Sequence, residues 1–101
     1  FFRGRPDWDA LRRVPGSHVT AIQLSDAPAL PAPDPVAETL HGRLLPGEGE
    51  LDLARLLAAL REIGADAPLG VEVFSDALHA LAPGDAARRA GDALRRLRAG
   101  G

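Results

Sequence analysis

The order of predicted helices and strands places this sequence in the α/β fold class. Two β-branched or apolar segments, residues 18–24 and 69–74, are predicted strands, and each is followed by a segment with helical periodicity. Strands that alternate with helices are expected to pair in parallel through right-handed crossovers. A parallel sheet normally has more than two strands and helices on both faces. We therefore expect these 101 residues, which amount to one small domain at most, to be part of a larger β/α architecture.

Three helices are predicted around the two strands. The first runs from the capping residue Asp7 to about residue 14, and the second runs from the cap Asp52 to about residue 63, where Gly64 ends it. The last extends from Asp85 to about residue 97, and its terminal arginines suit the helix dipole. Residues 25–50 form a proline-rich connection, and connections of this length inside a compact domain are usually functional or disordered.

Alternation along the strands determines which side chains share a face. In the first strand Gln23 points away from the face that carries Ile22 and Leu24, and in the second strand Glu72 points away from Val71. Gln23 and Glu72 occupy equivalent places near the C-terminal ends of their strands. The pattern therefore predicts two polar side chains on otherwise apolar strands.

The composition excludes several classes of function. A net charge of −2 gives no electrostatic reason to expect a nucleic acid or an anionic membrane surface as partner. The absence of cysteine excludes disulfides, thiolate metal sites and cysteine nucleophiles, and it fits a reducing, cytoplasmic compartment. No apolar run approaches the roughly 20 residues of a membrane span. Lysine is absent too, which excludes a P-loop.

Glu72 is the most informative single residue. An unpaired carboxylate on a buried strand would cost several kcal/mol or would stay protonated, so a metal ion or an arginine should compensate it. A solvent-exposed face, with Glu72 as a surface residue, is the alternative. The amide oxygen of Gln23 is a hard neutral ligand that, beside a carboxylate, favours Mg²⁺, Mn²⁺ or Co²⁺. For an isolated glutamine, hydrogen bonding in the core or at a strand end is the commoner role.

A second group of polar residues lies in the long connection, just before a Pro-Gly-x-Gly turn. Arg43 could bind a carboxylate, a phosphate or paired hydroxyls, and His41 could shuttle a proton or donate a hydrogen bond. Polar groups placed ahead of a tight turn are typical of binding loops, although each could also be a solvated loop residue. Asp26 follows the first strand and is expected to cap a turn.

Three segments, in this order, resemble the C-terminal part of the xylose isomerase-like TIM-barrel family: residues 22–28 (IQLSDAP), 43–50 (RLLPGEGE) and 71–74 (VEVF). The resemblance covers nearly the whole chain and implies a (β/α)8 barrel. Such a barrel has about 250 residues. Residues 1–101 would then be a truncated piece, the last two strands with their flanking helices, carrying half of the family's metal ligands.

The resemblance also implies residue roles and an activity. Gln23 and Glu72 correspond to metal ligands, Glu72 also to an acid/base, and Arg43 and His41 to residues that contact the substrate. The implied enzyme is a divalent-metal-dependent isomerase or epimerase of a small sugar, sugar phosphate or hydroxy-keto acid, acting through an enediolate. A homo-oligomer of the full-length protein is compatible with this interpretation.

Two alternatives accompany that interpretation. Residues 39–43 (TLHGR) are similar to the Ser-Arg-His-x-Arg segment of bacterial 3-dehydroshikimate dehydratases, with Leu40 in place of the first arginine. A dehydratase would use the same metal-stabilised enolate but would expel water. The other alternative is that the chain alone is a non-catalytic fragment, because half of a ligand set should bind a metal weakly.

Overall fold

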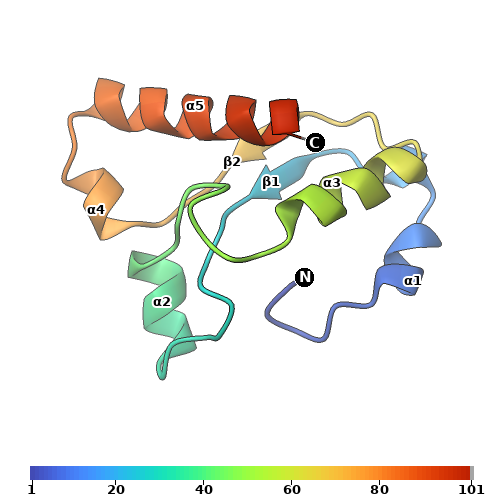
Figure 1. The fold of residues 1–101 in the computed structure, drawn as a ribbon, viewed down its shortest axis with the longest axis horizontal. Coiled ribbons are helices and arrows are strands. Elements are labelled where there is room, and N and C mark those ends of the chain that lie inside the picture. Colours follow the sequence, from blue (N-terminus) through green and yellow to red (C-terminus); the bar gives the residue numbers. More distant parts are fainter. Residues whose placement is uncertain (101) are drawn as a thin grey trace.

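The computed structural model describes residues 1–100 and contains a two-stranded parallel sheet with helices packed against it (Figure 1). The strands are β1 (Ile22–Leu24) and β2 (Leu69–Val71). Their register pairs Ile22 with Leu69, Gln23 with Gly70 and Leu24 with Val71. The predicted α/β class and the parallel pairing of the strands are confirmed.

The helices vary widely in length. In chain order they are α1 (Trp8–Arg12), the 3₁₀ helix η1 (Gly16–His18), α2 (Pro35–His41), α3 (Leu53–Glu62), α4 (Asp76–His79) and α5 (Pro83–Gly100). The predicted caps are confirmed, because the carboxylates of Asp7 and Asp52 accept backbone N–H groups of the first turns of α1 and α3. Gly64 follows α3 with a positive φ of 74°, as expected for a helix stop.

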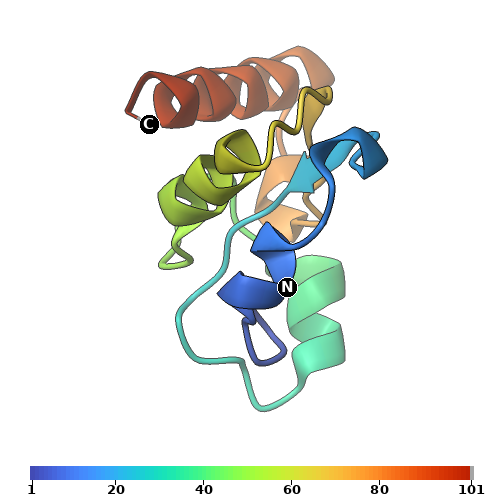
Figure 2. The same ribbon diagram turned by 90° about the vertical axis from the view of Figure 1, so that its right-hand side faces the viewer.

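The proline-rich connection contains one helix, α2. Pro35 stands in its first turn, where the missing N–H costs nothing, and Asp34 accepts the N–H groups of Val36 and Ala37. Proline therefore starts this helix and does not prevent it. Figure 2 shows α2 at the opposite end of the molecule from α5.

Both strands are shorter than predicted. Residues 16–18 form η1, and pairing begins only where the Ile22 N–H bonds to the Pro68 carbonyl at 2.9 Å. The second strand ends at Val71, so Glu72 follows β2 directly and does not lie within it, although its N–H still bonds to the Leu24 carbonyl at 3.1 Å. Strand length depends on the paired partner as well as on β propensity, and for that reason the apolar pattern overestimated it.

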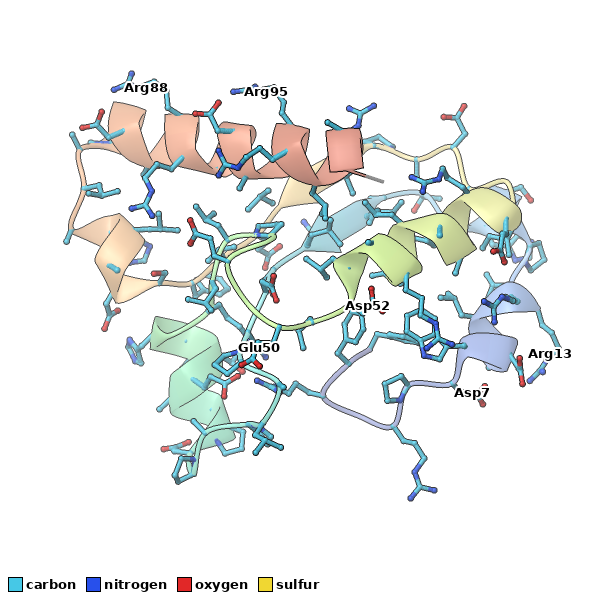
Figure 3. The ribbon with its side chains drawn as sticks, in the orientation of Figure 1. Asp7, Arg13, Glu50, Asp52, Arg88 and Arg95 are labelled. Carbon is cyan, nitrogen blue, oxygen red and sulfur yellow. The ribbon has the colours of Figure 1, made fainter. Side chains whose placement is uncertain are left out.

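The core lies between one face of the sheet and the helices. Its buried cluster consists of Leu24, Leu53, Leu57 and Leu60, and partly buried residues of α5 pack against this cluster. Figure 2 shows α3 and α5 beside each other and next to the strands. On the outer side of α5, Arg88 and Arg95 point away from the sheet (Figure 3). Within residues 1–100, α3 and α5 thus cover the face that carries Leu24, whereas Gln23 on the opposite face is exposed.

Candidate functional site

Gln23 and Glu72 lie on the uncovered face of the sheet. Gln23 pairs with Gly70, and because side chains alternate, Glu72 two residues further on shares that face. Both side chains are exposed. Within residues 1–100 the Glu72 carboxylate has no hydrogen-bond or ion-pair partner. The alternation is confirmed for β1, where Leu24 is buried and Gln23 exposed, and for Glu72 the structure agrees with the alternative of an exposed residue.

Arg43 lies at the same end of the sheet and is tied to three neighbours. Its N–H bonds to the Phe74 carbonyl at 3.1 Å. Its guanidinium donates to the Glu38 carboxylate at 3.3 Å and to the Thr39 hydroxyl at 3.2 Å. Arg43 and Gln23 both line a hollow of about 200 Å³, which Glu72 does not reach. The structure therefore brings two of the predicted site residues to one cavity.

His41 has different surroundings from Arg43. It is the last residue of α2, its side chain is exposed, and its Nδ1 lies 3.1 Å from Asp76 Oδ1 on α4. It does not line the hollow shared by Gln23 and Arg43. The chain bends where α2 ends at Gly42, and two residues that are close in sequence diverge there.

Asp26 was expected to cap a turn. The structure confirms a capping role and extends it to several backbone N–H groups of a loop distant in sequence. Its side chain is buried, with the residue 1% exposed, and accepts four backbone N–H groups. Oδ1 accepts from Ala27 at 2.8 Å and Leu51 at 3.1 Å, whereas Oδ2 accepts from Gly47 at 2.9 Å and Gly49 at 3.1 Å. This carboxylate holds the Pro-Gly-x-Gly loop closed.

The four hydrogen bonds to the Asp26 carboxylate are called the Asp26 clamp below. The backbone of Asp26 also fixes the segment that carries Arg43. The backbones of Asp26 and Leu44 exchange two hydrogen bonds, at 2.8 and 2.9 Å, and form an antiparallel bridge. Arg43, the preceding residue, is held on the other side by Phe74. Figure 3 shows the loop continuing past Glu50 to Asp52 at the start of α3.

Glu38 is a central residue that the sequence analysis missed. Its carboxylate is buried in α2 and accepts hydrogen bonds from Arg3 at 2.6 Å, from Arg43 at 3.3 Å and from the Ala32 N–H at 2.6 Å. The Ala32 hydrogen bond, followed by that from Arg3, lowers the pKa of Glu38 below its ordinary value. Arg3 is 35 residues away in sequence, so no local spacing marks this contact.

The donor chemistry on the open face fits part of a divalent cation site. Gln23 and Glu72 offer an amide and a carboxylate oxygen, which are hard ligands that suit Mg²⁺, Mn²⁺ and similar ions. Among residues 1–100 no group of three or more His, Cys, Asp or Glu side chains is arranged to hold a metal. A complete coordination sphere would need further donors. In the same part of the chain, no helix is long and apolar enough to cross a membrane.

Comparison with other proteins gives the family. Residues 1–99 match the family model of the xylose isomerase-like TIM barrel. A 3-dehydroshikimate dehydratase of Pseudomonas putida is 40% identical over 91 residues, which are 90% of this chain and 14% of that enzyme. A 3-dehydroshikimate dehydratase of Pseudomonas aeruginosa is 42% identical over 67 residues, 66% of this chain and 10% of that enzyme.

Two solved structures share the fold. The crystal structure of the IolI protein with a bound zinc atom superposes with a TM-score of 0.79 at 24% identity, over 92% of this chain and 32% of IolI. A fusion of a xylose isomerase-like TIM barrel with a 4-hydroxyphenylpyruvate dioxygenase gives a TM-score of 0.71 at 37% identity, over 90% of this chain and 14% of that protein. The two parallel strands and their helices are part of such a barrel. The chain belongs to the xylose isomerase-like TIM barrel family.

Proposed function

We propose that the protein carrying this chain dehydrates 3-dehydroshikimate, or a closely similar cyclic hydroxy-keto acid, with the help of a divalent cation. The observation that carries the proposal is the 40% identity over 91 residues to a dehydratase of that name. A second dehydratase of the same name supports it at 42% identity. Since the chain spans 14% and 10% of these relatives, the activity belongs to the whole protein and not to this segment alone.

The substrate's chemistry explains why such an enzyme needs these residue types. 3-Dehydroshikimate is a six-membered ring with a ketone, a hydroxyl on the adjacent carbon, a second hydroxyl on the next carbon, and a ring C=C bond that bears the carboxylate and is conjugated with the ketone. Removal of the proton from the hydroxyl-bearing carbon beside the ketone gives an enolate, and the second hydroxyl takes up a proton and leaves as water. Loss of a further ring proton, with return of a proton to oxygen, leaves 3,4-dihydroxybenzoate, so one substrate yields one aromatic acid and one water.

Each candidate residue has a role in this reaction. Gln23 and Glu72 would hold a divalent cation through oxygen atoms, and the cation would supply positive charge that acidifies a C–H beside a carbonyl. The Glu72 carboxylate would also take up the proton. Arg43 would bind the substrate's carboxylate, and His41 would donate a proton or contact a distal oxygen.

The isomerase or epimerase that the sequence analysis favoured remains the second candidate. It would act on an α-hydroxy carbonyl compound through the same proton removal, so the same residues would serve it. The observation in its favour is Leu40, which stands where the resembling dehydratases have an arginine.

The test uses the full-length gene product that contains this sequence, loaded in turn with Mn²⁺, Mg²⁺ and Co²⁺. We expect 3-dehydroshikimate to give 3,4-dihydroxybenzoate, followed by its aromatic absorbance and identified by mass spectrometry. Conversion of ketoses without conversion of 3-dehydroshikimate would favour the isomerase. Turnover of neither substrate class would favour a non-catalytic role.

A further inference from the structure

The hollow beside Gln23 is lined by a second arginine, Arg3, in addition to Arg43. The other lining residues are apolar or neutral: Phe1, Phe2, Leu24, Ser25, Leu51, Leu53 and Leu56. No acidic side chain among the described residues lines this hollow. Two positive charges therefore border one small cavity with no negative charge on its wall.

Glu38 accepts hydrogen bonds from the guanidinium groups of both arginines. Its Oε1 accepts from Arg3 at 2.6 Å and from Arg43 at 3.3 Å. Arg3 also donates to the carbonyls of Pro28 at 2.8 Å and Ala29 at 3.1 Å, which fixes it to the loop after β1. The two arginines are therefore preorganised, and a ligand would not need to order them.

The charge balance leaves room for one anion. One carboxylate, that of Glu38, faces two arginines, so one positive charge remains without a counter-charge in this cluster. Arg3 and Arg43 also line a second hollow, together with Glu38, Pro31 and Pro35. Of the two hollows that both arginines border, the one beside Gln23 is the one without an acidic side chain on its wall.

Arg3 also retains a donor that nothing satisfies. Its Nε is buried and has no hydrogen-bond partner within residues 1–100. Buried donors are nearly always paired in folded proteins, so this N–H is available to an acceptor that residues 1–100 do not supply. This observation is independent of the charge count.

We propose that Arg3 is a substrate-binding residue that, together with Arg43, receives the carboxylate of the substrate, and that Glu38 orients both guanidiniums. The proposal rests on the proposed function for the identity of the substrate. Two neighbouring positive charges suit a carboxylate, whereas a neutral sugar would gain nothing from the second charge. Arg3 would therefore determine the preference for acidic substrates.

The experiment compares two ligands that both carry two adjacent hydroxyl groups on an aromatic ring, of which only one also carries a carboxylate. Binding of 3,4-dihydroxybenzoate and of catechol to the full-length, Mn²⁺-loaded protein is measured by calorimetry for wild type, Arg3→Gln and Arg3→Lys. Arg5→Gln is the matched control, because Arg5 lies two residues away and lines a different hollow. All variants are checked for folding by circular dichroism.

We expect wild type and Arg5→Gln to prefer the carboxylated ligand, and Arg3→Gln to lose roughly tenfold or more of that preference while catechol binding changes less than about twofold. Arg3→Lys, which keeps the charge without the fork, should lose less and provides the test if Arg3→Gln does not fold. Equal weakening of both ligands, or an unchanged preference, would overturn the proposal. A protein that shows this preference but does not turn over 3-dehydroshikimate would refute the proposed function alone.

Discussion

Two carboxylates follow the two parallel strands, and their environments are opposite. Asp26 comes two residues after β1 and is 1% exposed, and its two carboxylate oxygens accept hydrogen bonds from four backbone N–H groups. Glu72 comes directly after β2 and is exposed on the uncovered face, and its carboxylate has no hydrogen-bond or ion-pair partner among residues 1–100. The first is fully used by the fold, and the second is free to bind something else.

The difference separates a structural acid from a candidate functional one. A carboxylate saturated by backbone N–H groups has no lone pair left for a metal or a proton, however close it lies to the site. An exposed carboxylate contributes little to stability and keeps its full capacity for a ligand. Changes at the two positions should therefore affect different properties of the protein.

Removing the Glu72 charge should have the largest effect on activity. We expect Glu72→Gln in the full-length protein to lower kcat roughly a thousandfold or more, since both metal binding and proton transfer would suffer. Its free energy of unfolding should change by less than about 0.5 kcal/mol, because the carboxylate makes no hydrogen bond or ion pair within residues 1–100. Kinetics with Mn²⁺ and urea denaturation measure the two effects, with Asp66→Asn as control, since Asp66 is exposed and likewise makes no such contact there. A strongly destabilised Glu72→Gln variant would contradict the comparison.

Removing the Asp26 carboxylate should have the largest effect on stability. Asp26→Ala leaves four backbone N–H groups without their acceptor, and we expect a loss of roughly 3 kcal/mol or more in the free energy of unfolding. Asp26→Asn keeps one acceptor oxygen and should lose less. Urea denaturation measures both, and the exposed Asp66→Ala, within about 0.5 kcal/mol of wild type, is the control. A loss no larger than that of Asp66→Ala would show that the loop does not depend on Asp26.

A methyl group at Gly49 tests how tightly the loop wraps Asp26. A Cβ there would lie 2.6 Å from the Ala27 carbonyl and would also overlap the Asp26 carboxylate. We expect Gly49→Ala to cost about 1–3 kcal/mol through displacement of the clamp. Gly47→Ala is the comparison, because its Cβ meets no atom within 4 Å and only its positive φ of 90° is unfavourable. A smaller loss for Gly49→Ala than for Gly47→Ala would contradict this arrangement.

The second buried acid, Glu38, should make stability depend on pH. Its pKa in the folded state is lowered from 4.5, first by the Ala32 hydrogen bond and then by Arg3. The stabilisation is therefore complete above 4.5 and is lost as the pH falls through the lower folded-state pKa. Glu38→Gln should be less stable than wild type at neutral pH, and the difference should shrink in acid. Urea denaturation at several pH values checks this, and a difference that grows toward low pH would refute it.

Sequence patterns predicted the parts of the fold that depend on neighbouring residues. The caps Asp7 and Asp52, the stop at Gly64 and the alternation that separates Gln23 from Leu24 follow from hydrogen bonds and side-chain directions within a few residues. The roles of Gln23, Glu72, Arg43 and His41 were suggested by residue chemistry and position and made specific by the family resemblance, and they stay predictions.

The sequence by itself determined the α/β order, the helix boundaries near their caps and the apolar face of each strand, because these are local. Only the tertiary structure decided where the strands end, that Asp26 is saturated by a loop 21 to 25 residues away, and that Arg3 meets Glu38 across 35 residues. The physical reason is that strand length and buried charge pairing are set by partners distant in sequence, and no local periodicity records which partners will meet.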